Sequence, residues 1–152
     1  MKKQLLAILF LSFSITVFSQ QINIIPKPND TKITSGNFAI TTPTVIVYGD
    51  DGEKNTANFL NSYLKKFYGF QLKISKQATS NYIQLSTKKF IKAPDNSAAY
   101  SLTITPKNIT ISGDGYEGTF YGMQSLIGLL PIAQSQTSNH KLVVPCLVIN
   151  DA

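Results

Sequence analysis

The sequence predicts an α+β domain in which a mostly antiparallel sheet is covered on one face by two helices. Three observations support this fold class: short β-type runs recur along the chain, two longer segments have helical periodicity, and turn residues separate these segments. The chain has 152 residues, of which 43% are hydrophobic, so it can fill the core of one domain without a metal or a disulfide.

The first residues have the composition of a signal peptide. Two lysines precede the run 5–19, which is apolar, uncharged and shorter than the roughly 20 residues that span a bilayer. Val17 and Ser19 are small residues at the positions that signal peptidase reads. We therefore predict that residues 1–19 are a signal peptide, and that the mature domain 20–152 is exported to the periplasm or the cell exterior without a membrane anchor.

Seven strands are expected after an extended lead-in over 22–28, whose two prolines disfavour a helix. The predicted strands are the runs 38–41, 45–48, 71–75, 82–86, 100–105, 109–112 and 142–149. Alternation of leucine and isoleucine with threonine and serine in the fifth and sixth runs indicates a sheet with one buried face. The Pro-Lys-Asn segment 106–108 between these two runs is typical of an antiparallel hairpin.

The first helix is predicted over 53–68, where apolar residues recur at steps of three and four: Ala57, Leu60, Leu64 and Phe67. Asp50, followed three residues later by Glu53, resembles a capping box. Gly69 stands just past the last turn, where a left-handed cap residue is needed.

The second helix is predicted over 119–130 and ends before Pro131. It is rich in glycine, although each internal glycine costs about 1 kcal/mol relative to alanine. Because Gly118, Gly122 and Ser125 share one smooth face, we expect this helix to lie tightly on the sheet.

The segment 113–118, Gly-Asp-Gly-Tyr-Glu-Gly, matches the dinucleotide-binding pattern G-x-G-x-x-G. We reject a nucleotide site because the preceding strand belongs to a hairpin rather than to a βαβ unit. In addition, Asp114 and Glu117 would repel a pyrophosphate at the helix N-terminus. The glycines are instead expected to form a tight turn into a closely packed helix, and no cofactor is predicted.

Residues for metal, nucleophilic or nucleic-acid chemistry are scarce. Cys146 and His140 are the single cysteine and histidine, and neither adjoins a carboxylate cluster. We interpret Cys146 as a small buried hydrophobe and His140 as a solvated turn residue. All 14 cationic residues are lysines, and the lack of arginine argues against a nucleic-acid site. Several lysines are expected to form a solvated face: Lys65, Lys66, Lys88, Lys89 and Lys92.

The carboxylates are expected to be structural or solvated, although glycosidases use two carboxyl groups that face a sugar about 5–10 Å apart. The mature chain has eight, assigned to a turn (Asp30), helix caps (Asp50, Asp51, Glu53), helix flanks (Asp114, Glu117) and loops (Asp95, Asp151). We therefore predict no catalytic, cofactor-binding or metal-binding residue in this chain.

Three segments, in order, resemble a known family: 24–28 (Ile-Ile-Pro-Lys-Pro), 100–104 (Tyr-Ser-Leu-Thr-Ile) and 118–131, which runs from Gly-Thr-Phe-Tyr-Gly to Leu-Leu-Pro. They are similar to the N-terminal, non-catalytic domain of glycoside hydrolase family 20 β-N-acetylhexosaminidases. The closing run 144–152 resembles the strand with which that domain leads into the catalytic barrel. The resemblance covers the whole mature chain.

The resemblance implies a parent enzyme that releases terminal N-acetylhexosamine from glycans with an aspartate–glutamate pair on a (β/α)₈ barrel. This chain has no Asp-Glu dipeptide, and a barrel of about 250 residues does not fit after residue 152, so we expect the chain alone to be inactive. The expected partner is the barrel of the same polypeptide, docked near 142–149, through which the glycan is bound. The alternative is a free-standing exported carbohydrate-binding or adhesion module without catalysis.

Export is expected to remove residues 1–19 and to leave Gln20 as the first residue of the mature chain. The reason is the combination of a charged start, a short apolar run and small residues before the cleavage point. Intact-mass spectrometry of the secreted protein tests this prediction. A secreted form that retains Lys2 and Lys3 would contradict it.

Overall fold

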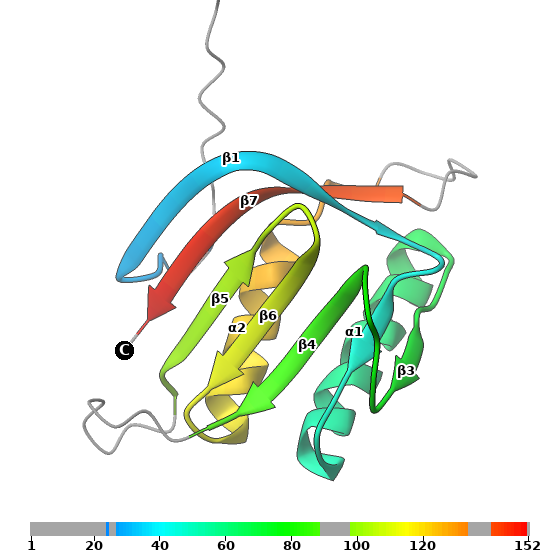
Figure 1. The fold of residues 1–152 in the computed structure, drawn as a ribbon, viewed down its shortest axis with the longest axis horizontal. Coiled ribbons are helices and arrows are strands. Elements are labelled where there is room, and N and C mark those ends of the chain that lie inside the picture. The colour runs from blue at the N-terminus through cyan, green and yellow to red at the C-terminus, as the bar shows by residue number, and fades with distance from the viewer. Residues whose placement is uncertain (1–23, 25–26, 89–97, 134–140, 152) are drawn as a thin grey trace, which may run out of the picture.

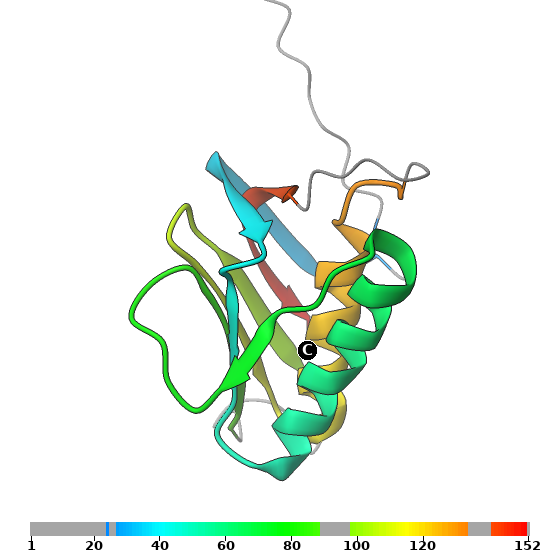
Figure 2. The same cartoon turned by 90° about the vertical axis from the view of Figure 1, so that its right-hand side faces the viewer.

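The structure is a computed structural model that describes residues 24, 27–88, 98–133 and 141–151. Its elements are β1 (Asp30–Thr41), β2 (Val45–Val47), α1 (Asp51–Tyr68), β3 (Lys73–Ser75), β4 (Tyr82–Thr87), β5 (Tyr100–Ile104), β6 (Asn108–Gly113), α2 (Gly115–Gly128) and β7 (Lys141–Asp151). The seven strands form one sheet in the order β1-β7-β5-β6-β4-β2-β3. Both helices lie on the same face of this sheet (Figures 1 and 2), which confirms the predicted α+β class and the placement of the helices.

The sheet is mixed, so the prediction of a mostly antiparallel sheet is wrong. β3, β2, β4 and β6 are parallel neighbours, whereas β6, β5, β7 and β1 are antiparallel neighbours. The parallel half follows from α1, because a helix that connects β2 to its neighbour β3 brings the chain back in the same direction. The β-type runs were each recognisable in the sequence, but their composition does not encode strand direction.

The hairpin predicted around 106–108 is confirmed, since β5 and β6 pair antiparallel. The turn is closed by the amide of Thr105, which donates to the carbonyl of Asn108 at 2.9 Å. Asn108 itself is the first residue of β6.

The first strand is longer than predicted, because β1 begins at Asp30 rather than at Phe38. Asp30 therefore pairs with Asn150 of β7 instead of lying in a turn. The register shifts between Ile33 and Asn37, and Gly36 has a φ of 100° within this bulge. Every residue of β1 before Phe38 is exposed, so no alternation of apolar and polar residues marks this half of the strand.

The predicted caps of the first helix are confirmed. The side chain of Asp50 accepts a hydrogen bond from the amide of Glu53 at 3.0 Å, and Gly69 has the left-handed φ of 77°. Leu60 and Leu64 are fully buried as expected, but Phe67 is 46% exposed and does not belong to the core.

α2 lies tightly on the sheet, as its glycines predicted, although it starts one turn earlier than expected. A Cβ atom added to Gly122 would lie 2.6 Å from Cγ2 of Ile111 and 3.1 Å from the ring of Tyr100. Next to this contact, the Tyr100 hydroxyl and Ser125 Oγ are 2.6 Å apart and share a hydrogen bond. The small residues therefore allow the helix to contact β5 and β6 directly.

β7 is an interior strand between β1 and β5. Five of its apolar residues are buried in the core: Leu142, Val144, Cys146, Leu147 and Ile149. The expectation that 142–149 forms a docking surface is therefore wrong for these five residues, although Val143 is 45% exposed. The reading of Cys146 as a buried hydrophobe is confirmed. Burial also raises the pKa of the Cys146 thiol.

Replacing Gly122 with alanine is expected to lower the free energy of unfolding by about 1 kcal/mol, because the steric cost of the added methyl exceeds the gain in helix propensity. Gly128→Ala is the matched control, since its Cβ would meet only Ile24 at 3.8 Å. Urea unfolding of residues 20–152 measures both variants. Equal or higher stability of Gly122→Ala would contradict the close contact.

Candidate functional site

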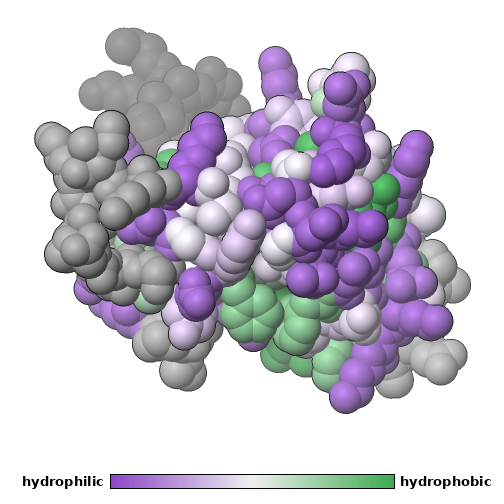
Figure 3. Space-filling model, turned by 90° about the horizontal axis from the view of Figure 1, so that it is seen from below, coloured by the Kyte–Doolittle hydropathy of each residue, from purple (hydrophilic) through white to green (hydrophobic). Residues whose placement is uncertain are grey.

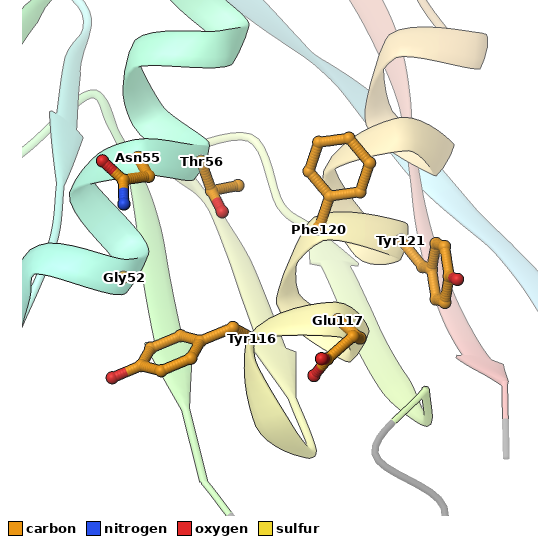
Figure 4. Close-up of a pocket in the computed structure, with 7 residues that line it drawn as sticks. All are labelled: Gly52, Asn55, Thr56, Tyr116, Glu117, Phe120 and Tyr121. Carbon is orange, nitrogen blue, oxygen red and sulfur yellow. The ribbon is translucent and has the colours of Figure 1, made fainter.

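A groove lies between the first turns of the two helices (Figure 4). Both helices follow strands of the parallel half of the sheet, so their N-termini come together at one edge. The groove has a volume of about 420 Å³ and is lined by Gly52, Asn55, Thr56, Tyr116, Glu117, Phe120 and Tyr121. Three aromatic rings and one carboxylate therefore share this site.

Tyr116 lines the groove and connects the two helix N-termini. Its hydroxyl donates to Oδ2 of Asp50 at 3.0 Å. Its ring lies against Gly52, where an added Cβ would be 2.1 Å from a ring carbon. The pKa of Asp50 is lowered chiefly by the hydrogen bond from the Glu53 amide and further by the Tyr116 hydroxyl, while the same bond to Asp50 raises the pKa of Tyr116.

Glu53 is a buried carboxylate that binds the backbone rather than a ligand. It is only 4% exposed, and it accepts hydrogen bonds from the amides of Gly49 and Thr87, each at 2.5 Å. These bonds tie the start of α1 to the end of β4. The sequence predicts a capping role for Glu53, but no sequence signal indicates a partner 34 residues away.

The other described carboxylates also have no catalytic partner opposite them in the groove. Asp114 is buried at the start of α2, and Asp151 accepts a hydrogen bond from the Asn29 amide at 3.1 Å. Asp51 is exposed in the first turn of α1. Glu117 is the only carboxylate among the residues that line the groove.

The glycine motif 113–118 serves a tight turn, as predicted. A Cβ on Gly113 would lie 1.9 Å from the amide nitrogen of Thr119, and Gly115 has a φ of 76°. Contrary to the prediction, the strand before this motif is not confined to a hairpin, because β6 pairs in parallel with β4 as well as antiparallel with β5. The close backbone contact at Gly113 nevertheless accounts for the glycine.

Within the residues that the structure describes, no group of three His, Cys, Asp or Glu residues is placed to hold a metal ion. In the same ranges, neither helix is long and apolar enough to cross a membrane. His140, Asp95, Lys89 and Lys92 lie outside the described residues. Lys65, Lys66 and Lys88 are exposed, as expected for a solvated face.

Several aromatic side chains lie close together on the outer side of the helix layer. This cluster was not predicted from the sequence. We call the following residues the aromatic surface: Phe59, Tyr63, Phe67, Tyr116, Phe120 and Tyr121. The signal for it was the four-residue spacing of Phe59, Tyr63 and Phe67, which places these three on one side of a helix.

The same fold occurs within solved glycosidases. An exo-β-N-acetylglucosaminidase from Vibrio harveyi superposes with a TM-score of 0.69 at 19% identity, over 85% of this chain and 19% of that chain. An N-acetyl-β-hexosaminidase from Streptomyces plicatus gives 0.68 at 22% identity, over 84% and 26%. A chitobiase from Flavobacterium johnsoniae gives 0.62 at 23% identity, over 86% and 20%. The fold is thus that of a domain found inside larger family 20 enzymes.

A comparison of the sequence with known families establishes the family of this chain. Residues 21–152 match the family described as glycosyl hydrolase family 20, domain 2, and the chain belongs to this family. The β-hexosaminidase of Porphyromonas gingivalis is 29% identical over 139 residues, which are 88% of this chain and 18% of that protein. The resemblance to the non-catalytic domain is therefore confirmed, and the chain spans about a fifth of the length of this relative.

Replacing Glu53 with alanine is expected to lower the free energy of unfolding by about 2 kcal/mol or more, because two backbone amides lose their acceptor. Glu117→Ala is the control, since Glu117 is an exposed carboxylate in the first turn of α2, where such a charge contributes only a few tenths of a kcal/mol to about 1 kcal/mol. Chemical denaturation of the two variants tests this difference. Equal losses would show that Glu53 has no special structural role.

Proposed function

We propose that this chain is the exported accessory domain of a β-N-acetylhexosaminidase that releases terminal N-acetylhexosamine from glycans. A (β/α)₈ barrel of the same polypeptide performs the catalysis. The observation that carries this proposal is the family match over residues 21–152, together with a β-hexosaminidase relative of which this chain covers only 18%. Export is proposed from the charged start and short apolar run of residues 1–19.

The roles of the carboxylates support an accessory rather than a catalytic function. Substrate-assisted or double-displacement hydrolysis needs carboxyl groups free to act on the anomeric centre. In the described chain, Asp50 caps a helix and Glu53 is occupied by two backbone amides. Glu117 faces an open groove without a second carboxylate among the lining residues. The reaction is therefore assigned to the barrel.

A second candidate is a free-standing exported module that binds carbohydrate without cleaving it. The groove favours this candidate through its composition, because Tyr116 and Tyr121 offer ring faces and Asn55 offers an amide. Aromatic rings and amides are the groups that contact the apolar and hydroxyl-bearing sides of sugars. Binding of N-acetylglucosamine to the chain alone would distinguish this candidate from the accessory domain.

The purified mature chain is expected to show no hydrolysis of a chromogenic N-acetylglucosaminide, because the part of the chain that the structure describes has no pair of free carboxyl groups around a sugar-sized site. The same domain joined to its barrel is the positive control. Release of the chromophore is followed by absorbance. Turnover that copurifies with the short chain, and disappears in Glu117→Gln, would overturn the assignment.

A further inference from the structure

We propose that β7 is a latch for the whole domain: the sheet and the helix layer are folded only while β7 lies between β1 and β5, and this dependence keeps the chain unfolded for export until β7 is in place. The part of this inference that concerns export rests on the proposed function. Three observations support the latch: the place of β7 in the sheet, its share of the core, and the dependence of β1 on it.

β7 connects the start of the domain to the centre of its sheet. It pairs antiparallel with β1 on one side and with β5 on the other, and Figure 1 shows it between these two strands. Asp30 of β1 is the register partner of Asn150, and the amide of Asn29 donates to Oδ1 of Asp151 at 3.1 Å. Without β7, the sheet would have no pairing that joins β1 to β5.

β7 and β1 together hold a large share of the hydrophobic core. Phe38 of β1 is the register partner of Val144, and Ile104 of β5 is that of Leu147, so β7 brings side chains from both neighbours together. The net stability of a domain is small compared with the sum of its apolar contacts, so the loss of several such residues unfolds it. The core residues on these two strands are Phe38, Ile40, Leu142, Val144, Cys146, Leu147 and Ile149.

β1 depends on β7 for its order. Among the described strands, β1 pairs with β7 alone. Every residue of β1 before Phe38 is exposed, so this half of the strand is held by backbone pairing rather than by burial. At the bulge, a Cβ added to Gly36 would lie 3.6 Å from Sγ of Cys146, so the two strands also fit closely there. Loss of β7 therefore removes β1 from the sheet as well.

A sheet without β7 would expose what the complete domain covers. With β7 in place, the face of the domain in Figure 3 is mostly hydrophilic, with apolar side chains gathered in one area. Without β7, the backbone groups of β5 that now pair with β7 would form an open edge beside an apolar core. An open edge is a template for strand pairing. We therefore expect a free peptide with the sequence of β7 to take its place.

The position of the latch in the chain suits export. A polypeptide that crosses a membrane through a translocation channel does so unfolded, and a domain that folds early would be retained. The proposed signal peptide comes first and β7 is the last of the described elements. Since the sheet needs a contact between its first and last strands, closing of the fold is delayed by the order of the strands.

A cut between α2 and β7 tests the latch in the complete domain. A protease site is placed within residues 134–140 of the chain 20–152, and the folded protein is cut there. The urea midpoint of the helical circular dichroism signal should then rise with protein concentration, because unfolding releases β7. The uncut protein is the control, and its midpoint should not depend on concentration. A midpoint that is independent of concentration in the cut protein would overturn the proposal.

A synthetic peptide of residues 141–151 tests whether the strand can be supplied separately. In reducing buffer, a tenfold excess should raise the midpoint of the cut protein, or restore its helical signal if cutting alone unfolds it. The same peptide with Leu147→Asp and Ile149→Asp is the control, since it would bury two carboxylates, and it should have neither effect. Equal effects of both peptides, or no effect of the native one, would overturn the latch.

Circular permutation tests the link to export. The end of β7 lies beside the start of β1, so a flexible linker can join residue 152 to residue 20. The permutant, in the order 141–152, linker and 20–140, keeps every residue of the mature domain and makes the pairing of β7 with β1 far more local. It should refold at least tenfold faster than the natural order and, behind residues 1–19, be exported at least severalfold more slowly.

A destabilised permutant controls for its altered start. Leu147→Ala in the permutant removes core contacts and should restore export toward the rate of the natural order. Equal refolding rates of the permutant and the natural order would overturn the latch. Faster refolding with unchanged export, or slow export that Leu147→Ala does not relieve, would overturn its role in export.

These outcomes separate the latch from the proposed function. The cut protein and the peptide need neither export nor a catalytic barrel, so they decide the latch alone. A chain in the natural order that stays in the cell and retains residues 1–19 would overturn the proposed export and the role of the latch in it.

Discussion

The helix layer depends on the contact of α2 with the strands beneath it. At Gly113 and Gly122 the backbone of one element approaches atoms of the other so closely that no Cβ fits between them. This close approach allows Met123 and Leu126 of α2 to be fully buried, and the resulting dispersion contacts stabilise the packing of the helix on the sheet. α1 packs beside α2, and the rings of Phe59 and Phe120 are in edge-to-face contact between the two helices.

Features coded by neighbouring residues were predictable from the sequence. The cap at Asp50, the left-handed Gly69 and the turn between β5 and β6 each depend on a few consecutive residues, and each is confirmed. The smooth face of α2 was also predictable, because its small residues recur at helical spacing. These local structures are present in the folded chain because its tertiary contacts agree with the local preferences of the residues.

Features that depend on distant partners were not predictable. The direction of β4 relative to β6 and the burial of Glu53 both arise from segments far apart in the chain. The first half of β1 has no apolar periodicity, since its order comes from backbone pairing with β7. Phe67 has the spacing of a core residue, yet it lies on the outer side of its helix, because periodicity reports amphipathic character and does not identify what covers each face.

The pairing of β1 with β7 joins the first strand of the domain to the last one. Among the described strands, β1 lies at the edge of the sheet and pairs with β7 alone, so Asp30 finds its partner Asn150 only after nearly the whole domain has left the ribosome. Before β7 is synthesised, Phe38 and Ile40 of β1 have no partner strand to pair with. Folding of this domain is therefore a late event in synthesis, dominated by long-range contacts, and nascent chains are exposed to aggregation or to chaperones during this interval.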